Sequence, residues 1–322
     1  MINLGRLQIR NKLILAPISM YSDIGFRKVC YDYGAGYGFT ERIYAEELIA
    51  AKRQITRKID FFDEAGLQLL TNNPAELSQA IKIVNEKKIY PNLENIKSID
   101  LNLGCPTREL IKQNMGAALL NQHDKVRQLF RVMRKTTELP ISAKIRLGLN
   151  PKHKKEKPYL AIARIAAEEG LDFITVHARD AWQLYSGKVD YSALKEIKDQ
   201  VKIPLVGNGG VVNEETAQKM LRYCDAIMIG QQALHSPFIF KQIEYFMKTG
   251  RRMEISIETE KKKTIKKYFE YALYYDIGFQ RLKIHTQAFL KGMPNSSKLV
   301  AKLTSLRNKD DLMDAVSEYL YQ

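Results

Sequence analysis

The chain is poor in cysteine and has no long apolar run. Its 322 residues include three cysteines, an odd number with wide spacing, which does not fit the disulfide framework of a secreted domain. We therefore expect a cytoplasmic protein. No window approaches the roughly 20 apolar residues of a membrane span. The apolar segment nearest the start, residues 13–18, has only the length of a strand. Neither a membrane partner nor a secretory leader is predicted.

Acidic residues and metal-ligand patterns are also scarce. No cluster of cysteine and histidine has the spacing of a metal site, so no metal is predicted. Aspartate and glutamate number 36 against 51 lysines and arginines, which gives a net charge of +15. A chain this basic favours a polyanionic partner, although an ordinary solvated basic surface has the same composition.

The chain does have a regular alternation of short apolar runs and helical patterns, up to about residue 245. Eight runs are predicted to be strands, at residues 13–18, 38–43, 66–70, 99–103, 141–146, 173–177, 205–208 and 226–229. Amphipathic stretches such as 74–87 lie between them, and Asn213 has the position of a helix N-cap before residues 214–223. Eight strand–helix units, the last with a helix at 237–247, predict an α/β fold. A parallel sheet closed into a TIM (β/α)8 barrel is favoured over an open doubly wound sheet.

The composition changes after Gly250, where the strand-like runs stop. Lysines at 261–263 and 266–267 and several tyrosines follow helical spacing as far as residue 322. We predict two domains, a TIM-barrel domain at 1–245 and an all-helical domain at 246–322. The lysine run either contacts phosphates or is a solvated face.

Residues 98–106, Ser-Ile-Asp-Leu-Asn-Leu-Gly-Cys-Pro, are the most informative segment. The apolar alternation predicts a buried strand that ends at Gly104, with Cys105 and Pro106 just beyond it. A thiol on the loop after a strand is placed for chemistry, whereas a buried structural cysteine is the common alternative. Cys30 and Cys224 occur in helical patterns and are predicted to be structural.

Working residues of a TIM barrel lie at the carboxyl ends of its strands. This rule selects Pro17, Ile18, Glu41, Gln68, Asn102, Cys105, Lys144, Arg146, His177, Asn208, Gly209, Gly230 and Gln231. The set lacks the paired carboxylates of a glycosidase and a Ser-His-Asp group. Amides, cations and glycines instead suit a planar, polar heterocycle that carries a phosphate.

Two glycine-containing turns locate this phosphate. Residues 207–210 follow the seventh predicted strand and Gly230 follows the eighth, where barrel enzymes commonly bind phosphate, although tight turns alone also need glycine. Lys144 lies in an apolar strand and should point into the barrel mouth toward an anionic or polar partner, with Arg146 on the same side. His177 is either a ligand donor or a core histidine.

Segment 101–107 together with residues 115–120 resembles the signature of the dihydrouridine synthases, flavin enzymes that reduce uridine in tRNA. Further matches follow in the family's order, at 15–17, 23–27, Glu41, Gln68, 143–148, 176–179, 185–187, 207–210, 228–230 and 289–294. The resemblance covers nearly the whole chain.

The resemblance implies FMN as cofactor, NADPH as reductant, tRNA as substrate and a C-terminal domain that binds tRNA; we expect a monomer. It implies that the flavin gives a hydride from N5 to uracil C6 and that Cys105 gives a proton to C5. A free thiol is largely protonated at neutral pH, which suits an acid. The cofactor is expected to contact Ala16, Pro17, Ile18, Gln68, Asn102, Lys144, His177, Asn208, Gly209, Gly210, Gly230 and Gln231. The substrate is expected to contact Glu41, Asn102, Arg146, Arg179 and Tyr185.

A uridine in folded RNA must leave its stack to react, and the lysine-rich residues 152–157, predicted as a loop on the active-site face, either reach RNA phosphates or form a mobile loop. The chain departs from the family pattern at 18–21, Ala178, Asp180 and 231–232. Two other functions compete with tRNA reduction. One is an FMN barrel that acts on a free pyrimidine, and the other is an RNA-binding barrel without activity.

Overall fold

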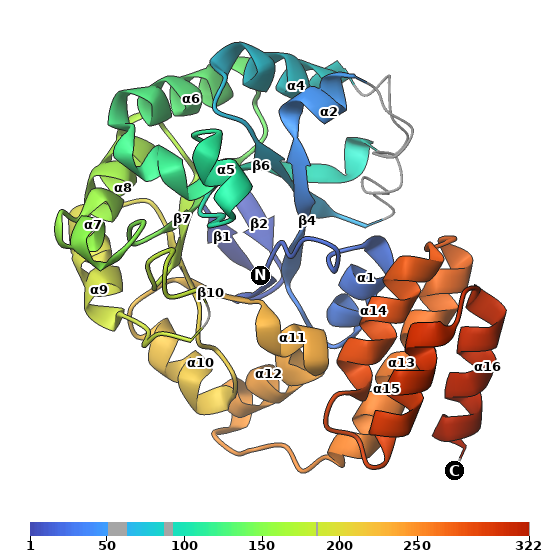
Figure 1. Ribbon diagram of the computed structural model, residues 1–322. Helices are drawn as coiled ribbons and strands as arrows, with labels where there is room; N and C mark the ends of the chain where they lie inside the picture. The colour runs from blue at the N-terminus through green and yellow to red at the C-terminus, as the bar shows by residue number, and fades with distance from the viewer. Residues whose placement is uncertain (51–62, 87–92, 185, 322) are drawn as a thin grey trace.

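Eight parallel strands close into a barrel that helices surround (Figure 1). The structure, a computed structural model, describes residues 1–50, 63–86, 93–184 and 186–321. The barrel strands are β3 (Leu13–Leu15), β4 (Tyr37–Tyr44), β5 (Ala65–Leu70), β6 (Ile96–Leu103), β7 (Ile141–Arg146), β8 (Phe173–His177), β9 (Leu205–Asn208) and β10 (Ala226–Ile229). Their order, β10-β3-β4-β5-β6-β7-β8-β9, confirms the predicted TIM barrel.

The strand sequences are apolar because both of their faces are buried. In β5 all six residues are buried, and β8 is buried throughout. Strands of a parallel sheet covered by helices read as continuous hydrophobic runs for this reason. Each of the eight predicted runs contains one of the barrel strands or overlaps it, so sequence position and fold agree along the whole barrel.

Helices cover the outside of the barrel (Figure 1). The helices of this part of the chain are α1 (Ile24–Asp32), α2 (Ala45–Ile49), α4 (Pro74–Glu86), α5 (Arg108–Lys112), α6 (His123–Thr136), α7 (Pro151–Lys155), α8 (Pro158–Glu168), α9 (Tyr191–Gln200), α10 (Glu214–Leu221), α11 (Gln231–His235) and α12 (Ile239–Thr249). In Figure 1 the short helix α5 lies inside the ring that the others form. Short 3-10 turns occur at Leu93–Asn95 and Gly116–Asn121. Asn213 caps α10 as predicted, accepting a hydrogen bond from the Thr216 N–H at 3.0 Å.

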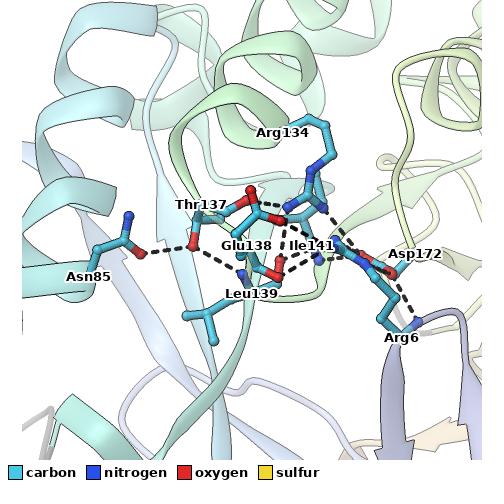
Figure 2. A network of polar contacts seen from close by, with 8 residues as sticks. All are labelled: Arg6, Asn85, Arg134, Thr137, Glu138, Leu139, Ile141 and Asp172. Atoms are coloured by element: carbon cyan, nitrogen blue, oxygen red, sulfur yellow. Dashed lines mark hydrogen bonds and ion pairs between the residues drawn. The ribbon is translucent and has the colours of Figure 1, made fainter.

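An antiparallel hairpin, β1 (Ile2–Leu4) and β2 (Leu7–Ile9), closes the amino end of the barrel and was not predicted. Its buried Leu4 and Leu7 pack with the first residue of β8, Phe173. Arg6 in the turn between the two strands makes paired 2.8 Å contacts with the Asp172 carboxylate, part of the network in Figure 2. The hairpin leaves the opposite end of the barrel, where the carboxyl ends of the strands lie, uncovered.

Four helices, α13 (Ile257–Tyr274), α14 (Phe279–Leu290), α15 (Ser296–Ser305) and α16 (Lys309–Leu320), form the helical C-terminal part. Figure 1 shows them on one side of the barrel, where α13 packs against α1 and α14 against α11. Because α12 continues to Thr249, the connection between the two parts lies at 250–256. Within the described ranges, no helix is long and apolar enough to cross a membrane.

Two local expectations were wrong. Residues 152–157 are not a loop throughout, because Asn150 caps the short helix α7 and Pro151 begins it. His153 of this helix is buried and accepts from the Leu149 N–H at 3.1 Å. Cys224 follows α10 instead of lying within it, but it is buried, as a structural cysteine should be.

Candidate active site

A cavity of about 770 Å³ opens at the carboxyl ends of the barrel strands. It is lined by every residue predicted to contact the cofactor, and by Cys105. Those residues are Ala16, Pro17, Ile18, Gln68, Asn102, Lys144, His177, Asn208, Gly209, Gly210, Gly230 and Gln231. The strand register explains this convergence, since Asn102 pairs with Lys144 and His177 pairs with Asn208 across neighbouring strands. The fold therefore brings the predicted residues together from strands all around the barrel and from the loops that follow them.

The turn after β6 holds Cys105 at the wall of the cavity. The Asn102 side-chain oxygen accepts from the backbone N–H groups of Gly104 at 3.2 Å and Cys105 at 3.0 Å. Cys105 is half-buried and its Sγ lies 3.8 Å from the Thr107 hydroxyl. At Gly116 φ is 57°, and a Cβ there would lie 2.6 Å from the Cys105 carbonyl oxygen, so this neighbour must be glycine. The backbone of Cys105 is thus held at its N–H by Asn102 and packed at its carbonyl oxygen against Gly116.

A chain of hydrogen bonds behind this turn begins at Asp100. The Asp100 carboxylate accepts from the Ser142 hydroxyl at 2.6 Å and from the Gln68 amide at 2.8 Å. The Gln68 oxygen in turn accepts from the Asn102 amide at 2.8 Å. All four side chains are nine-tenths buried or more, so the bonds are shielded from water.

Asp100 and Lys144 form an electrostatically coupled pair in the barrel. Burial raises the pKa of Asp100 to about 6, against the hydrogen bonds from Ser142 and Gln68 and the charge of Lys144. Burial also lowers the pKa of Lys144 to about 8, and the neighbouring Arg146 lowers it further. At neutral pH both groups are therefore mostly charged, and Lys144 places a positive charge at the cavity wall.

His177 is a neutral residue of the cavity wall. Burial lowers its pKa well below the usual value, and the charges of Arg146, Lys144 and Arg179 add to the shift. The buried His177 Nδ1 has no hydrogen-bond partner among the residues that the structure describes. An uncharged imidazole with an unsatisfied nitrogen fits contact with a polar heterocycle.

The turns after β9 and β10 have the backbone that a phosphate cradle needs. Gly209 and Gly210 have φ of 100° and 71°, and a Cβ on Gly210 would lie 2.4 Å from Val189. Gly230 precedes α11 and leaves room beside Ala16. The residues present therefore fit a flavin mononucleotide. The side-chain amides, Lys144 and His177 offer polar contacts for its ring system, and the glycine turns offer backbone N–H groups for its phosphate.

Two predicted substrate arginines line the cavity but are already bonded. Arg146 is buried and donates to the carbonyl oxygens of Gly104 at 3.1 Å and Asp180 at 2.9 Å. Arg179 is half-buried and donates to the Gly187 carbonyl. Arg146 thus ties the loop of Cys105 to the segment after β8. Tyr185 lies outside the described residues.

Arg42 lines the cavity, whereas its neighbour Glu41, which was expected to contact the substrate, does not appear among the described lining residues. The pairing of β4 with β5 shifts register between Phe39 and Arg42. Arg42 donates to the Ser19 hydroxyl at 2.6 Å and lies 3.6 Å from Cys105 Sγ. Strand alternation alone cannot reveal such a bulge, so sequence analysis missed Arg42.

Glu41 instead joins the barrel to the helical part. Its carboxylate accepts from the Met20 N–H at 2.7 Å and forms an ion pair with Arg281 of α14. Three residues beyond Met20, Asp23 accepts from the Tyr268 hydroxyl at 3.0 Å and lies 3.1 Å from His285 Nε2. The loop between β3 and α1, which carries Ile18 and other cavity residues, is thus held from outside by α13 and α14.

Comparison with known proteins identifies the family of the chain. The model of the family described as "Dihydrouridine synthase (Dus)" matches residues 14–321. A probable tRNA-dihydrouridine synthase of Rickettsia bellii is 29% identical over 99% of this chain and 98% of its own length. tRNA-dihydrouridine synthase B of Klebsiella pneumoniae is 31% identical over 77% of this chain and 75% of its own.

Solved structures share the fold at low identity. An old yellow enzyme homologue from Zymomonas mobilis has a TM-score of 0.53 at 13% identity, covering 80% of this chain and 94% of that one. Morphinone reductase also has a TM-score of 0.53, at 12% identity, covering 76% of this chain and 88% of that one. With a family model matched from the first barrel strand to the last helix, the chain belongs to the dihydrouridine synthase family.

Proposed function

We propose that this chain is a tRNA-dihydrouridine synthase that uses bound FMN and NADPH to reduce the C5=C6 bond of specific uridines. The observation that carries the proposal is the position of Cys105. Its thiol shares one cavity with Lys144, His177 and the glycine turns, which are the groups suited to hold a flavin. An acid and a flavin site facing one space are what the saturation of a pyrimidine double bond requires.

The chain's own residues would orient the cofactor. Gly209, Gly210 and Gly230 would receive the phosphate, and Lys144 would neutralise negative charge on the ring system. His177 Nδ1 and the amides of Gln68 and Asn102 would contact polar atoms of the heterocycle. When bound and reduced, FMN supplies the hydride that uracil C6 accepts from N5.

Cys105 would complete the reduction as the proton donor. Its S–H bond breaks as the C5–H bond forms, and the electron pair remains on sulfur. The guanidinium of Arg42, 3.6 Å from Sγ, and the Thr107 hydroxyl, 3.8 Å away, stand where they would stabilise the resulting thiolate. A proton from solvent then restores the thiol for another turnover.

A basic surface beside the cavity would receive the RNA. Lys152 and Lys155 of α7 are exposed, whereas Lys154 and Lys157 pair with Asp190 and Glu196. The exposed pair supports a polyanionic substrate at the mouth of the barrel more directly than net charge does. We propose tRNA as that substrate in place of a free pyrimidine.

A substrate comparison tests the proposal. The purified protein is loaded with FMN, reduced, and mixed with unmodified tRNA transcript, uracil or uridine monophosphate, and reoxidation of the flavin is followed by absorbance. The proposal predicts fast reoxidation by tRNA alone. Fast reoxidation by a free pyrimidine with none by tRNA, or a protein that takes up no FMN, would contradict it.

A further inference from the structure

Trp182 is the chain's only tryptophan, and it stands exposed beside the active-site cavity. It is 75% exposed and lies on the segment between β8 and α9. Arg179 and Leu184, three residues before it and two after it, both line the cavity. Tryptophan is on average highly buried in folded proteins, so an exposed one at this position indicates a surface that a ligand covers.

The backbone that carries Trp182 is fixed by hydrogen bonds. The Trp182 N–H donates to the Leu149 carbonyl at 3.0 Å, and the Ala181 N–H donates to Gly148 at 2.8 Å. On either side of Trp182, the Asp180 N–H donates to the Gln183 side-chain oxygen at 3.0 Å, and the Gln183 N–H donates to the Asp180 carboxylate at 2.9 Å. A ring presented on a fixed loop binds without the entropic cost of ordering that loop.

Two exposed apolar side chains, Leu184 and Val212, line the cavity near the segment that carries Trp182. Leu184 is 51% exposed and adopts a φ of 49°, a left-handed conformation that leucine rarely takes. Val212 is 53% exposed and also lines the cavity. Strained backbone at the edge of a site is a feature of ligand-binding positions.

Positive charge lies on the neighbouring segment. Leu149, which accepts from the Trp182 backbone, is followed directly by the Asn150 cap and by α7 with its exposed Lys152 and Lys155. An aromatic platform beside cations is the combination that binds unstacked nucleic acid, because bases stack on the ring while phosphates contact the cations. The charge favours RNA over an apolar protein partner.

We propose that Trp182 stacks on a base adjacent to the reacting uridine in tRNA. The inference rests on the proposed function and extends it to how the RNA is opened. When a uridine leaves its stack, the neighbouring base loses a stacking partner. The Trp182 ring, next to the cavity that receives the uridine, takes the place of that partner.

Substitutions at Trp182 in the full-length holoenzyme test the proposal against unmodified tRNA transcript. Trp182→Ala and Trp182→Leu should each weaken tRNA binding by about 10- to 100-fold, the range expected when a base–aromatic stack is removed. Trp182→Phe should stay within about 3-fold of wild type, since phenylalanine also stacks. The salt dependence of binding should not change in any of them, because an indole ring neutralises no phosphate charge. Flavin absorbance and melting temperature verify that each variant is folded.

Tryptophan fluorescence gives a second measurement, because Trp182 is the one tryptophan of the chain. Quenching of Trp182 by acrylamide should fall when tRNA is added to the wild-type holoenzyme. Binding by Trp182→Ala within 2-fold of wild type, or unchanged quenching, would overturn the inference. If wild type forms dihydrouridine while Trp182 stays exposed, only the inference fails. If tRNA protects Trp182 but no dihydrouridine forms, Trp182 contacts tRNA, but the proposed function fails and there is no reacting uridine for the stacked base to adjoin.

Discussion

At the scale of residues, one buried carboxylate determines how the amides of the site are oriented. An ionised Asp100 can only accept hydrogen bonds, so the Gln68 amide must direct its NH2 group toward it. The Gln68 oxygen must then accept from Asn102, whose own oxygen is left to accept from the Cys105 N–H. Asp100 therefore positions the proposed acid through two other side chains.

The raised pKa of Asp100 predicts how stability depends on pH. Its pKa is about 6 in the folded protein against 3.8 as the ordinary value, so the folded state binds the proton more tightly. The stabilisation is complete below about pH 4 and is lost as pH rises through 6. Relative to Asp100→Asn, wild type should lose at most about 3 kcal/mol of unfolding free energy across this interval.

Urea denaturation of both proteins at several pH values between 4 and 7 measures this difference. Lys144 does not interfere, because its pKa of about 8 lies outside the interval. A raised pKa at Asp100 would be contradicted if the difference in unfolding free energy between the two proteins were constant with pH. It would also be contradicted if wild type became more stable relative to Asp100→Asn as pH rises.

At the scale of elements, the contact between β4 and α14 links the helical part to the cavity wall. The Glu41 and Arg281 side chains are 6% and 19% exposed, so removing one leaves the other poorly solvated. We expect Arg281→Gln to cost about 1–3 kcal/mol of unfolding free energy. It should also weaken FMN binding, because Glu41 holds the Met20 backbone on the loop that carries Ile18.

The Lys302–Glu318 pair between α15 and α16 provides a matched control. Its atoms are 4.0 Å apart and both side chains are more than half exposed. Lys302→Gln should change the unfolding free energy by less than about 0.5 kcal/mol and leave FMN affinity unchanged. The account of the loop fails if Arg281→Gln behaves like this control in an FMN titration.

The barrel elements were predictable and their irregularities were not. Apolar runs such as 141–146 become strands because burial on both faces requires apolar side chains, and Asn213 fits its cap by simple chemistry. The β1–β2 hairpin is made of strands of three residues each, which alternate apolar and polar side chains too briefly for a pattern to show and form no continuous apolar run. The irregular register of β4, which leaves Arg42 and not Glu41 at the cavity, depends on pairing with β5 and not on local sequence, so it could not be predicted.

At the scale of the whole molecule, a net charge of +15 does not show which lysines are free to bind RNA. From the sequence, those of α13 either contact phosphates or form a solvated face. In the structure, Lys262 pairs with Glu258 and Lys267 pairs with Asp32. Lys261 is buried and donates to the Phe289 carbonyl at 3.0 Å. Such interactions depend on tertiary structure, so composition alone could not separate these lysines from those of α7.

The ion pairs of Lys262 and Lys267 predict that the exposed lysines of α7 contribute more to tRNA binding than these two lysines of α13. Lys152→Gln with Lys155→Gln should weaken binding and reduce the log–log salt slope by somewhat under one unit for each of the two lysines that neutralises a phosphate. Lys262→Gln with Lys267→Gln carries the same change in net charge. It should leave the slope close to wild type, because these lysines already have acidic partners.

Titrations of labelled tRNA at several salt concentrations compare the two double variants. FMN content should be the same in both, since none of the four lysines is among the described residues that line the cavity. A larger decrease of slope in the α13 variant than in the α7 variant would place the RNA on the helical part and refute the assignment to α7.

The central claim is that Cys105 protonates a uridine of tRNA in this cavity. Its most direct test is nucleoside mass spectrometry of unmodified tRNA transcript after incubation with NADPH and FMN-loaded protein, wild type against Cys105→Ala. Wild type should convert specific uridines to dihydrouridine. The variant should keep its flavin and its tRNA affinity but form dihydrouridine about 10² to 10⁴ times more slowly, the usual effect of removing a positioned acid. No dihydrouridine with wild type, or an equal rate with Cys105→Ala, would contradict the account.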